Sequence, residues 1–285
     1  MNSVNSFGII GGDKRQLYCA QKMAEDGFTV YISGFEHCSC PPGCIPENPR
    51  TTARLSDAVI LPMPVSRSKG ELFAPFSDGI IPLSLLRQTI PADKPVLCGI
   101  NGAAEQYELD GLRIIRYSSR EEFAAANAVP TAEGAVEIAM REYEGTINGA
   151  DCLVTGYGNI GKILCFMLRG LGANVTAAAR KHKDRALIRG SGMKDADIYS
   201  LSGHYDLIFN TVPALIFDRH TLAQCAAESI IIDLASMPGG IDDNAADKLK
   251  IPVIHALSLP GKAAPKSAGI IIKNAVYNII REEEL

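Results

Sequence analysis

Short apolar runs alternate with amphipathic stretches along the chain. In the first half the apolar runs are FGIIGG, FTVYISG, DAVILPMP, KPVLCGI and LRIIRYS, and each is bounded by turn residues or helical segments. Between the first two runs, apolar residues recur at helical spacing through Leu17, Ala20 and Ala24, and the pattern stops at Gly27. This rhythm is typical of βαβ units, in which helices cover both faces of a parallel sheet.

Residues 119–149 interrupt the rhythm because they contain no strand candidate. Pro130, Thr131 and Glu133 predict a helix start there, and Gly149 predicts its end. The alternation then resumes with DCLVTG, a helix over 159–171, NVTAAA, YDLIFN, SIIIDLA and IPVIHA. We therefore expect two α/β domains with doubly wound parallel sheets, over 1–128 and 150–264, joined by a crossover helix over 129–149. The amphipathic segment 265–285 is expected to form a helix that packs back on the first domain.

Composition excludes several classes of protein. The 285 residues are 47% hydrophobic and 21% charged, as in ordinary soluble proteins. The net charge of -4 gives no electrostatic reason to expect nucleic acid or an anionic membrane as a partner. No apolar run reaches the roughly 20 residues that span a bilayer, and MNSVNSFGII lacks the basic segment of a signal peptide. We expect a cytoplasmic protein.

Three of the eight cysteines form a cluster with a histidine. His37, Cys38, Cys40 and Cys44 lie within HCSCPPGC. Four such side chains could hold zinc, but the spacing is not that of a standard zinc finger or ribbon. Reduced thiols in a proline-rich loop are the alternative, and we assign no metal.

GYGNIG has the glycine spacing of a dinucleotide-binding turn. The strand DCLVTG precedes it and a helix follows it, which is the required context. Gly156 permits the tight turn, Gly158 lets the backbone approach a pyrophosphate, and Gly161 allows close packing of helix and strand. The unpaired amides that open the helix would bind the pyrophosphate. We therefore predict a cofactor site that includes the whole turn: Gly156, Tyr157, Gly158, Asn159, Ile160 and Gly161.

The residues after the next strand bear on the choice of cofactor. An NAD site usually has an acidic residue there, which holds the 2′-hydroxyl of the ribose. Here Arg180 and Lys181 follow the strand, with no acid before Asp184. Since cations at a helix start oppose its dipole unless an anion joins them, we expect NADP rather than NAD. Two later loops are expected to line the nicotinamide, through Asn210, Thr211, Val212, Pro213, Asp233, Ala235 and Ser236.

Six motifs together resemble the family of the dehydrogenase-like A subunit of dipicolinate synthase, which endospore formers use to make pyridine-2,6-dicarboxylate. They are GGDKRQ, VPTAEGA, GYGNIG, NTVP, DLASMPGG and LPGKAAPKSAG, and they extend from one end of the chain to the other. The first and last are the most specific, whereas the glycine turn and NTVP occur in many dehydrogenases. Met237 departs from the basic residue that we expect in the DLAS-x-PGG loop, so Lys262 is a candidate to replace that cation.

The resemblance implies an architecture like that of formate/glycerate and alanine dehydrogenases. A substrate domain would precede the NADP-binding Rossmann domain, with the active site in the cleft between them. The implied reaction is oxidation of dihydrodipicolinate, or its hydrated precursor, by hydride transfer to NADP+ in the mother cell of a sporulating bacterium. The implied partner is the flavoprotein-like B subunit of dipicolinate synthase, and a homo-oligomer is expected.

A dicarboxylate substrate requires cationic or N–H-rich pockets. Arg15 could bind one carboxylate through its planar fork, and the other substrate candidates are Ser66, Thr131, Glu133 and Lys262. The first turn lacks a third glycine, so we expect an anionic substrate there rather than a second cofactor. Lys266, in the family motif, could bind a carboxylate or accept the proton that accompanies hydride loss.

Two rival functions remain. One is a redox-silent module that binds NADP(H) and scaffolds its flavoprotein-like partner. The other is a 2-hydroxy-acid or amino-acid dehydrogenase, which usually relies on a histidine paired with a carboxylate or on a lysine and a histidine, and no such pair is evident in the sequence.

Overall fold

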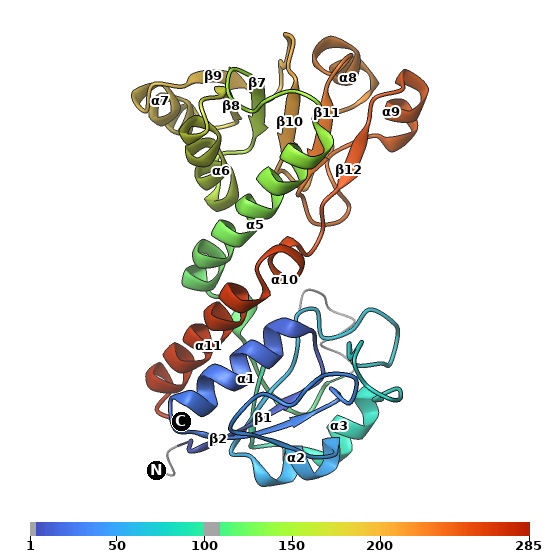
Figure 1. Ribbon diagram of the computed structural model, residues 1–285, viewed down its shortest axis with the longest axis vertical. Helices are drawn as coiled ribbons and strands as arrows, with labels where there is room; N and C mark the ends of the chain where they lie inside the picture. The colour runs from blue at the N-terminus through green and yellow to red at the C-terminus, as the bar shows by residue number, and fades with distance from the viewer. Residues whose placement is uncertain (1–3, 100–108) are drawn as a thin grey trace. The chain divides into compact units, whose positions relative to one another are not determined.

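The computed structural model describes residues 4–99 and 109–285. The chain divides into two compact units, the first formed by Met1–Asn127 with Ala264–Leu285 and the second by Ala128–Ala263. Each unit is built on a sheet of six parallel strands with helices on both faces (Figure 1). The predicted fold class, two doubly wound α/β sheets, is therefore confirmed.

The first sheet has the strand order β3-β2-β1-β4-β5-β6. Its strands are β1 (Ser6–Ile10), β2 (Thr29–Ser33), β3 (Cys44–Pro46), β4 (Ala58–Ile60), β5 (Pro95–Cys98) and β6 (Arg113–Arg116). Alternate residues of β1 point to opposite faces of the sheet. On one face, Phe7 and Ile9 pack against α1 (Lys14–Glu25) and α11 (Pro265–Glu282). Ile10 packs with α2 (Pro49–Leu55) and α3 (Leu83–Thr89) on the other face. A short 3-10 helix, η1 (Tyr117–Ser119), follows β6.

The C-terminal helix α11 packs along α1 within the first unit (Figure 1). Gly269 makes the close approach feasible, because a Cβ atom there would lie 2.5 Å from the carbonyl oxygen of Arg15. At the other end of α1, the Lys273 ammonium donates a hydrogen bond to Asp26 at 2.6 Å. This bond lowers the pKa of the Asp26 carboxyl.

The second sheet has the order β12-β11-β10-β7-β8-β9. Its strands are β7 (Asp151–Thr155), β8 (Asn174–Ala179), β9 (Lys194–Asp197), β10 (Leu207–Asn210), β11 (Ile230–Asp233) and β12 (Val253–His255). Read from β9, the order is the same as in the first sheet, and it is the order of a dinucleotide-binding fold. One face packs against α5 (Glu121–Glu142) and α6 (Asn159–Gly170). The helices that complete the unit are α7 (His182–Gly190), α8 (Arg219–Cys225), α9 (Asp243–Leu249) and α10 (Leu259–Ala263).

The predicted start of the crossover helix is wrong. Helix α5 begins at Glu121, and Pro130 lies inside it. Proline has no N–H, so the carbonyl of Ala126 loses its helical hydrogen bond. Ala126 is exposed, which lets water satisfy that carbonyl. Thr131 and Glu133 are therefore interior residues of a helix and do not open one.

Two strands have no counterpart in the predicted pattern. β3 lies within the cysteine- and proline-rich loop, and β9 has the polar sequence KDAD. Both are edge strands with little hydrophobic signal. The side chains of Asp195 and Asp197 in β9 pair with Arg185, and Asp195 also pairs with Arg189, which stabilises the polar strand against α7.

Candidate functional site

In both sheets the order of the strands reverses at the centre, between β1 and β4 and between β7 and β10. In this type of fold, ligands bind outside the carboxyl ends of the strands at such a switch point. The first switch point carries Arg15 and the second carries the glycine turn. The two switch points therefore offer different binding groups, a guanidinium group in the first unit and a glycine turn in the second, on sheets with the same strand order.

The glycine turn of the second unit has an uncapped helix start. Gly158 is the N-cap of α6, and no side chain caps the helix. The amide of Lys162 makes the first helical bond, to the Gly158 carbonyl at 3.0 Å. The amides of Asn159, Ile160 and Gly161 come before Lys162 in the chain and have no partner within the helix. These three N–H groups can therefore donate hydrogen bonds to an anion.

Two glycines in the turn are required by the packing. Gly156 has φ +92°, a conformation that L side chains rarely adopt, and a Cβ atom at Gly161 would lie 2.1 Å from the Gly156 carbonyl oxygen. At Gly158, by contrast, an added Cβ would meet nothing within 4 Å. The space above Gly158 is therefore open to a ligand.

A cavity of about 550 Å³ opens beside this turn. Six of the predicted cofactor residues line it: Gly156, Tyr157, Gly158, Arg180, Lys181 and Val212. Several other residues that were not predicted also line the cavity, among them Lys162, Asp184, Ile198, Tyr199 and Leu215. Tyr199 and Leu215 are largely exposed, at 73% and 63%, so their apolar surface is available to a flat ligand such as a nucleobase.

The cations at the start of α7 differ from those farther along it. Arg185 and Arg189 pair with aspartates of β9. Arg180 and Lys181 are exposed and line the cavity, and across residues 4–99 and 109–285 neither has an ion-pair partner within 4.0 Å. Lys181, the N-cap of α7, makes no side-chain capping bond. These two cations are free to bind an added anion, although the Asp184 carboxylate shares the cavity.

Asn210 and Asp233 lie below the surface, at the ends of neighbouring strands. Both are almost fully buried, and the Asn210 amide donates to Asp233 Oδ1 at 2.8 Å. Asn210 Oδ1 accepts from the Thr155 hydroxyl at 2.7 Å and from the Val212 amide at 3.2 Å. The Ala235 amide donates to Asp233 at 3.1 Å. This network joins the carboxyl end of β7 to the ends of β10 and β11 and the loops that follow them, so it fixes the strand ends next to the glycine turn.

The other predicted loop residues differ in exposure. Pro213 and Ser236 are exposed, whereas Thr211 is half-buried and donates its hydroxyl to the Thr155 carbonyl at 2.8 Å. None of these three, nor Asn159, Ile160, Gly161, Asn210, Asp233 or Ala235, lines the cavity beside the glycine turn.

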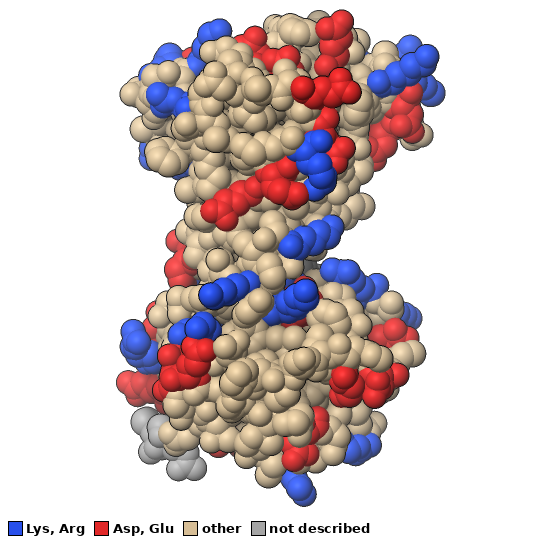
Figure 2. Space-filling model, in the orientation of Figure 1, with Lys and Arg blue, Asp and Glu red and all other residues tan. Residues whose placement is uncertain are grey.

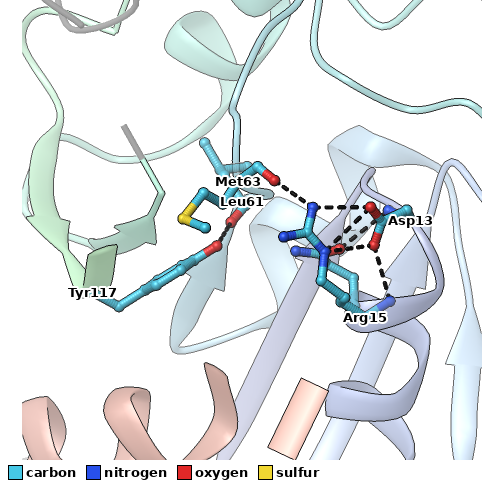
Figure 3. A network of polar contacts seen from close by, with 6 residues as sticks. Asp13, Arg15, Leu61, Met63 and Tyr117 are labelled. Atoms are coloured by element: carbon cyan, nitrogen blue, oxygen red, sulfur yellow. Dashed lines mark hydrogen bonds and ion pairs between the residues drawn. The ribbon is translucent and has the colours of Figure 1, made fainter. Parts of the chain in front are cut away.

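Arg15 occupies the first switch point and is 3% exposed (Figure 3). Its guanidinium group donates to the Asp13 carboxylate through Nε at 2.9 Å and Nη2 at 2.9 Å, and through Nη2 to the Met63 carbonyl. Within the described parts of the chain, Nη1 has no hydrogen-bond partner. Nearby, the Tyr117 hydroxyl donates to the Leu61 carbonyl at 3.0 Å.

The start of α1 is capped, unlike that of α6. Asp13 accepts from the Arg15 amide, and the Gln16 side chain accepts from the Asp13 amide, which completes a capping box. The amides of Gly11 and Gly12 donate to the carbonyls of Ser33 and Phe73. The amides of Gly11, Gly12, Asp13 and Arg15 are therefore used within the protein, and the Arg15 guanidinium group is the main anion-binding feature of this turn.

The remaining candidates are distributed over both units. Lys266 is exposed in the first turn of α11, one turn from the point where Gly269 meets Arg15. The Ser66 hydroxyl donates to the Ser68 carbonyl.

In the second unit Thr131 is buried, whereas Glu133 and Lys262 line a groove that also contains His255. His255 lies 2.9 Å from Asp243 and 3.6 Å from the buried Asp233, a histidine–carboxylate contact that sequence spacing did not reveal.

The thiols of the cysteine cluster Cys38, Cys40 and Cys44 are free in the structure. Burial raises the pKa of the Cys44 thiol to about 12, and Cys40 Sγ lies 3.4 Å from the Cys44 carbonyl oxygen. In the described parts of the chain no three His, Cys, Asp or Glu side chains are close enough to hold a metal ion. No helix in the described parts of the chain is long and apolar enough to cross a membrane.

Comparison with known proteins gives matches over both units. The family model of the N-terminal domain of the dipicolinate synthase A subunit matches residues 6–109. That of the NAD-binding domain of D-isomer specific 2-hydroxyacid dehydrogenases matches residues 120–246. The second unit is thus a pyridine-nucleotide-binding domain of the dehydrogenase type.

Whole-chain relatives agree with these matches. The dipicolinate synthase A subunit of Bacillus subtilis (strain 168) is 31% identical, over 97% of this chain and 96% of the relative. The crystal structure of the same subunit from Bacillus halodurans superposes with a TM-score of 0.87 at 28% identity, covering 98% and 99% of the two chains. D-lactate dehydrogenase from Escherichia coli shares the fold, with a TM-score of 0.59 at 17% identity and coverage of 98% and 97%. The chain belongs to the family of dipicolinate synthase A subunits.

Proposed function

We propose that this chain oxidises dihydrodipicolinate, or its hydrated precursor, to pyridine-2,6-dicarboxylate with NADP+ as the hydride acceptor. The observation that carries the proposal is the contrast between the two switch points. The second offers an uncapped helix start beneath open space, and the first offers a buried guanidinium group. Membership of the family of dipicolinate synthase A subunits supports the choice of substrate.

The cofactor would bind in the second unit. The amides that open α6 would donate hydrogen bonds to the pyrophosphate, and Arg180 with Lys181 would bind the 2′-phosphate of NADP. When bound, the nicotinamide supplies the hydride acceptor. The network of Thr155, Asn210 and Asp233 would hold the loops around it in one conformation.

The substrate carboxylates would bind to cations of the first unit. Arg15 is held in place by Asp13 and Met63, so its remaining N–H groups are oriented before a ligand arrives. Lys266 offers a second cation one turn from the contact between α11 and α1. Oxidation removes a hydride and a proton from the ring, and a water molecule leaves as well when the hydrated precursor is the substrate. The resulting aromaticity favours the product.

The test is a coupled assay. Dihydrodipicolinate synthase condenses pyruvate with aspartate semialdehyde in the presence of this chain and NADP+, with and without the flavoprotein-like B subunit. NADPH and dipicolinate that increase together support the proposal, and the effect of adding the flavoprotein shows whether this chain needs its partner. Dipicolinate without NADPH would contradict the proposal and would favour a redox-silent NADP(H)-binding module.

A further inference from the structure

The loop that follows β11, residues 234–240, lies against the carboxylate of Asp233. Near the start of the loop, the Ala235 amide donates to Asp233 Oδ1 at 3.1 Å. Near its end, a Cβ atom at Gly239 would lie 3.2 Å from Asp233 Oδ2. The loop therefore approaches both oxygens of one buried carboxylate, so its conformation depends on how that carboxylate is held.

Only one of these two oxygens is satisfied. Oδ1 accepts from Asn210 and from the Ala235 amide, whereas Oδ2 is buried and has no hydrogen-bond partner among residues 4–99 and 109–285. A buried carboxylate oxygen without a donor is energetically unfavourable. The ring of His255 lies just beyond hydrogen-bond distance, with Nδ1 at 3.6 Å from Oδ2.

His255 lies between two carboxylates. The parallel ladder of β11 and β12 pairs it with Asp233, and its Nε2 atom lies 2.9 Å from Oδ1 of Asp243, in the first turn of α9. Asp233 is 1% exposed, whereas Asp243 is 60% exposed. The ring can therefore connect a surface carboxylate to the buried one beneath the loop.

The number of protons on the ring decides which carboxylate it serves. A neutral imidazole has one N–H group and one lone pair, so it donates to Asp243 or to Asp233 but not to both. An imidazolium has two N–H groups and can donate to both. In the structure Asp243 has the short contact, and Asp233 Oδ2 is left without a donor.

The other charged groups around the ring are mainly acidic. His255 lines a groove of about 600 Å³ between α5, β12 and α10. Figure 2 shows a row of acidic side chains, with a basic one beside it, over α5. The charged groups near the ring are Asp233 of β11, Asp243 of α9, Glu133, Glu137 and Arg141 of α5, and Lys262 of α10.

We propose that His255 is a positioning residue for the loop 234–240, and that its imidazolium form joins Asp243 to Asp233. A small rotation of the ring brings Nδ1 within hydrogen-bond distance of Oδ2, which fixes the carboxylate beneath the loop. The neutral ring makes this bond only when it gives up the bond to Asp243, so the loop loses order as the pH rises and the ring loses its second proton. The link to catalysis rests on the proposed function, in which this loop lies beside the nicotinamide.

The experiment measures two quantities separately, the hydrogen-exchange protection of the Ala235 amide and the dissociation constant of NADPH. Both are measured at about pH 5 and about pH 8, the limits of the range in which imidazole groups titrate. Variant and wild type are compared at the same pH, so that the effects of pH on intrinsic exchange and on the cofactor's own phosphates cancel. His255→Leu is expected to lower the protection and the affinity about tenfold at the lower pH and to change them little at the higher pH.

Asp243→Asn keeps the ring and is expected to act in the opposite direction. The new amide can donate to Nε2, which leaves the N–H of the neutral ring for Asp233, so protection at the higher pH should exceed that of the wild type. The helix start is kept, because Asp242 is the N-cap of α9. His204→Leu is the matched control, since this exposed histidine of the same unit lies 4.0 Å from Glu228, and it should change neither quantity.

Two results would overturn the inference: equal protection of Ala235 in His255→Leu and the wild type at the lower pH, or an Asp243→Asn variant that is less protected than the wild type at the higher pH. If the protection follows the prediction while the affinity for NADPH does not change, His255 positions the loop and the placement of the nicotinamide beside this loop is wrong.

Discussion

The buried amide of Asn210 donates a hydrogen bond to the buried carboxylate of Asp233 at 2.8 Å. A charge in the interior is tolerated only when hydrogen bonds replace the lost water. Asp233 Oδ1 obtains such bonds from Asn210 and from the Ala235 amide, whereas Oδ2 is buried without a hydrogen-bond partner in the described parts of the chain. The pair therefore has a structural role that can be separated from cofactor contact.

Asn210→Ala should lower the free energy of unfolding by about 2–3 kcal/mol, because it removes a hydrogen bond to a buried charge. Urea unfolding followed by circular dichroism measures the change. Asn174→Ala is the matched control, since that side chain is exposed and donates to the Gly149 carbonyl. If the two variants shift the unfolding midpoint equally, Asn210 does not stabilise the carboxylate as described.

The glycine turn offers variants that separate binding from folding. Gly158→Ala should leave the thermal midpoint unchanged, because its Cβ meets no protein atom within 4 Å and its φ of -84° suits alanine. The methyl group should nevertheless weaken NADPH binding by about tenfold or more, which corresponds to about 1.4 kcal/mol. Calorimetric titration measures the dissociation constant.

Gly161→Ala is the contrasting variant and should lower the thermal midpoint, since its Cβ would lie 2.1 Å from the Gly156 carbonyl oxygen. If Gly158→Ala and the wild type bind NADPH with the same affinity, the pyrophosphate does not bind at this turn.

Arg180 is expected to decide between the two pyridine nucleotides. Arg180→Ala should weaken NADPH binding by about tenfold to a hundredfold, the loss of one or two charge-assisted bonds, and should leave NADH binding nearly unchanged. Arg185→Ala serves as the control, because that arginine is already paired with Asp195 and Asp197. Tighter binding of NADH than of NADPH by the wild type would instead favour Asp184 as the ribose ligand.

Arg15 is expected to determine substrate affinity. Arg15→Gln should raise the KM for the dicarboxylate by about tenfold or more while the dissociation constant of NADPH stays constant, because the arginine belongs to the first unit. Lys14→Gln is the neighbouring control, since Lys14 is exposed on the same helix. If the KM of Arg15→Gln is unchanged, Arg15 does not bind the substrate and only pairs with Asp13 within the capped turn.

The sequence predicted those features that depend on local pattern. The glycine turn and the strands with clear apolar runs are specified by neighbouring residues. The start of α5 was mispredicted because proline is most often found in a first helical turn, whereas here an exposed carbonyl accommodates it farther along. The pairings of Asn210 with Asp233 and of His255 with Asp233 join residues 23 and 22 positions apart, and only the register of β10, β11 and β12 brings them together.

The most direct measurement follows the hydride itself. The coupled assay is run with substrate that carries deuterium at its aliphatic ring carbons, and mass spectrometry examines the nicotinamide of the NADPH that forms. The proposed reaction predicts deuterium in the nicotinamide, in step with dipicolinate. Dipicolinate formed while the nicotinamide carries no deuterium would contradict hydride transfer to NADP+ by this chain.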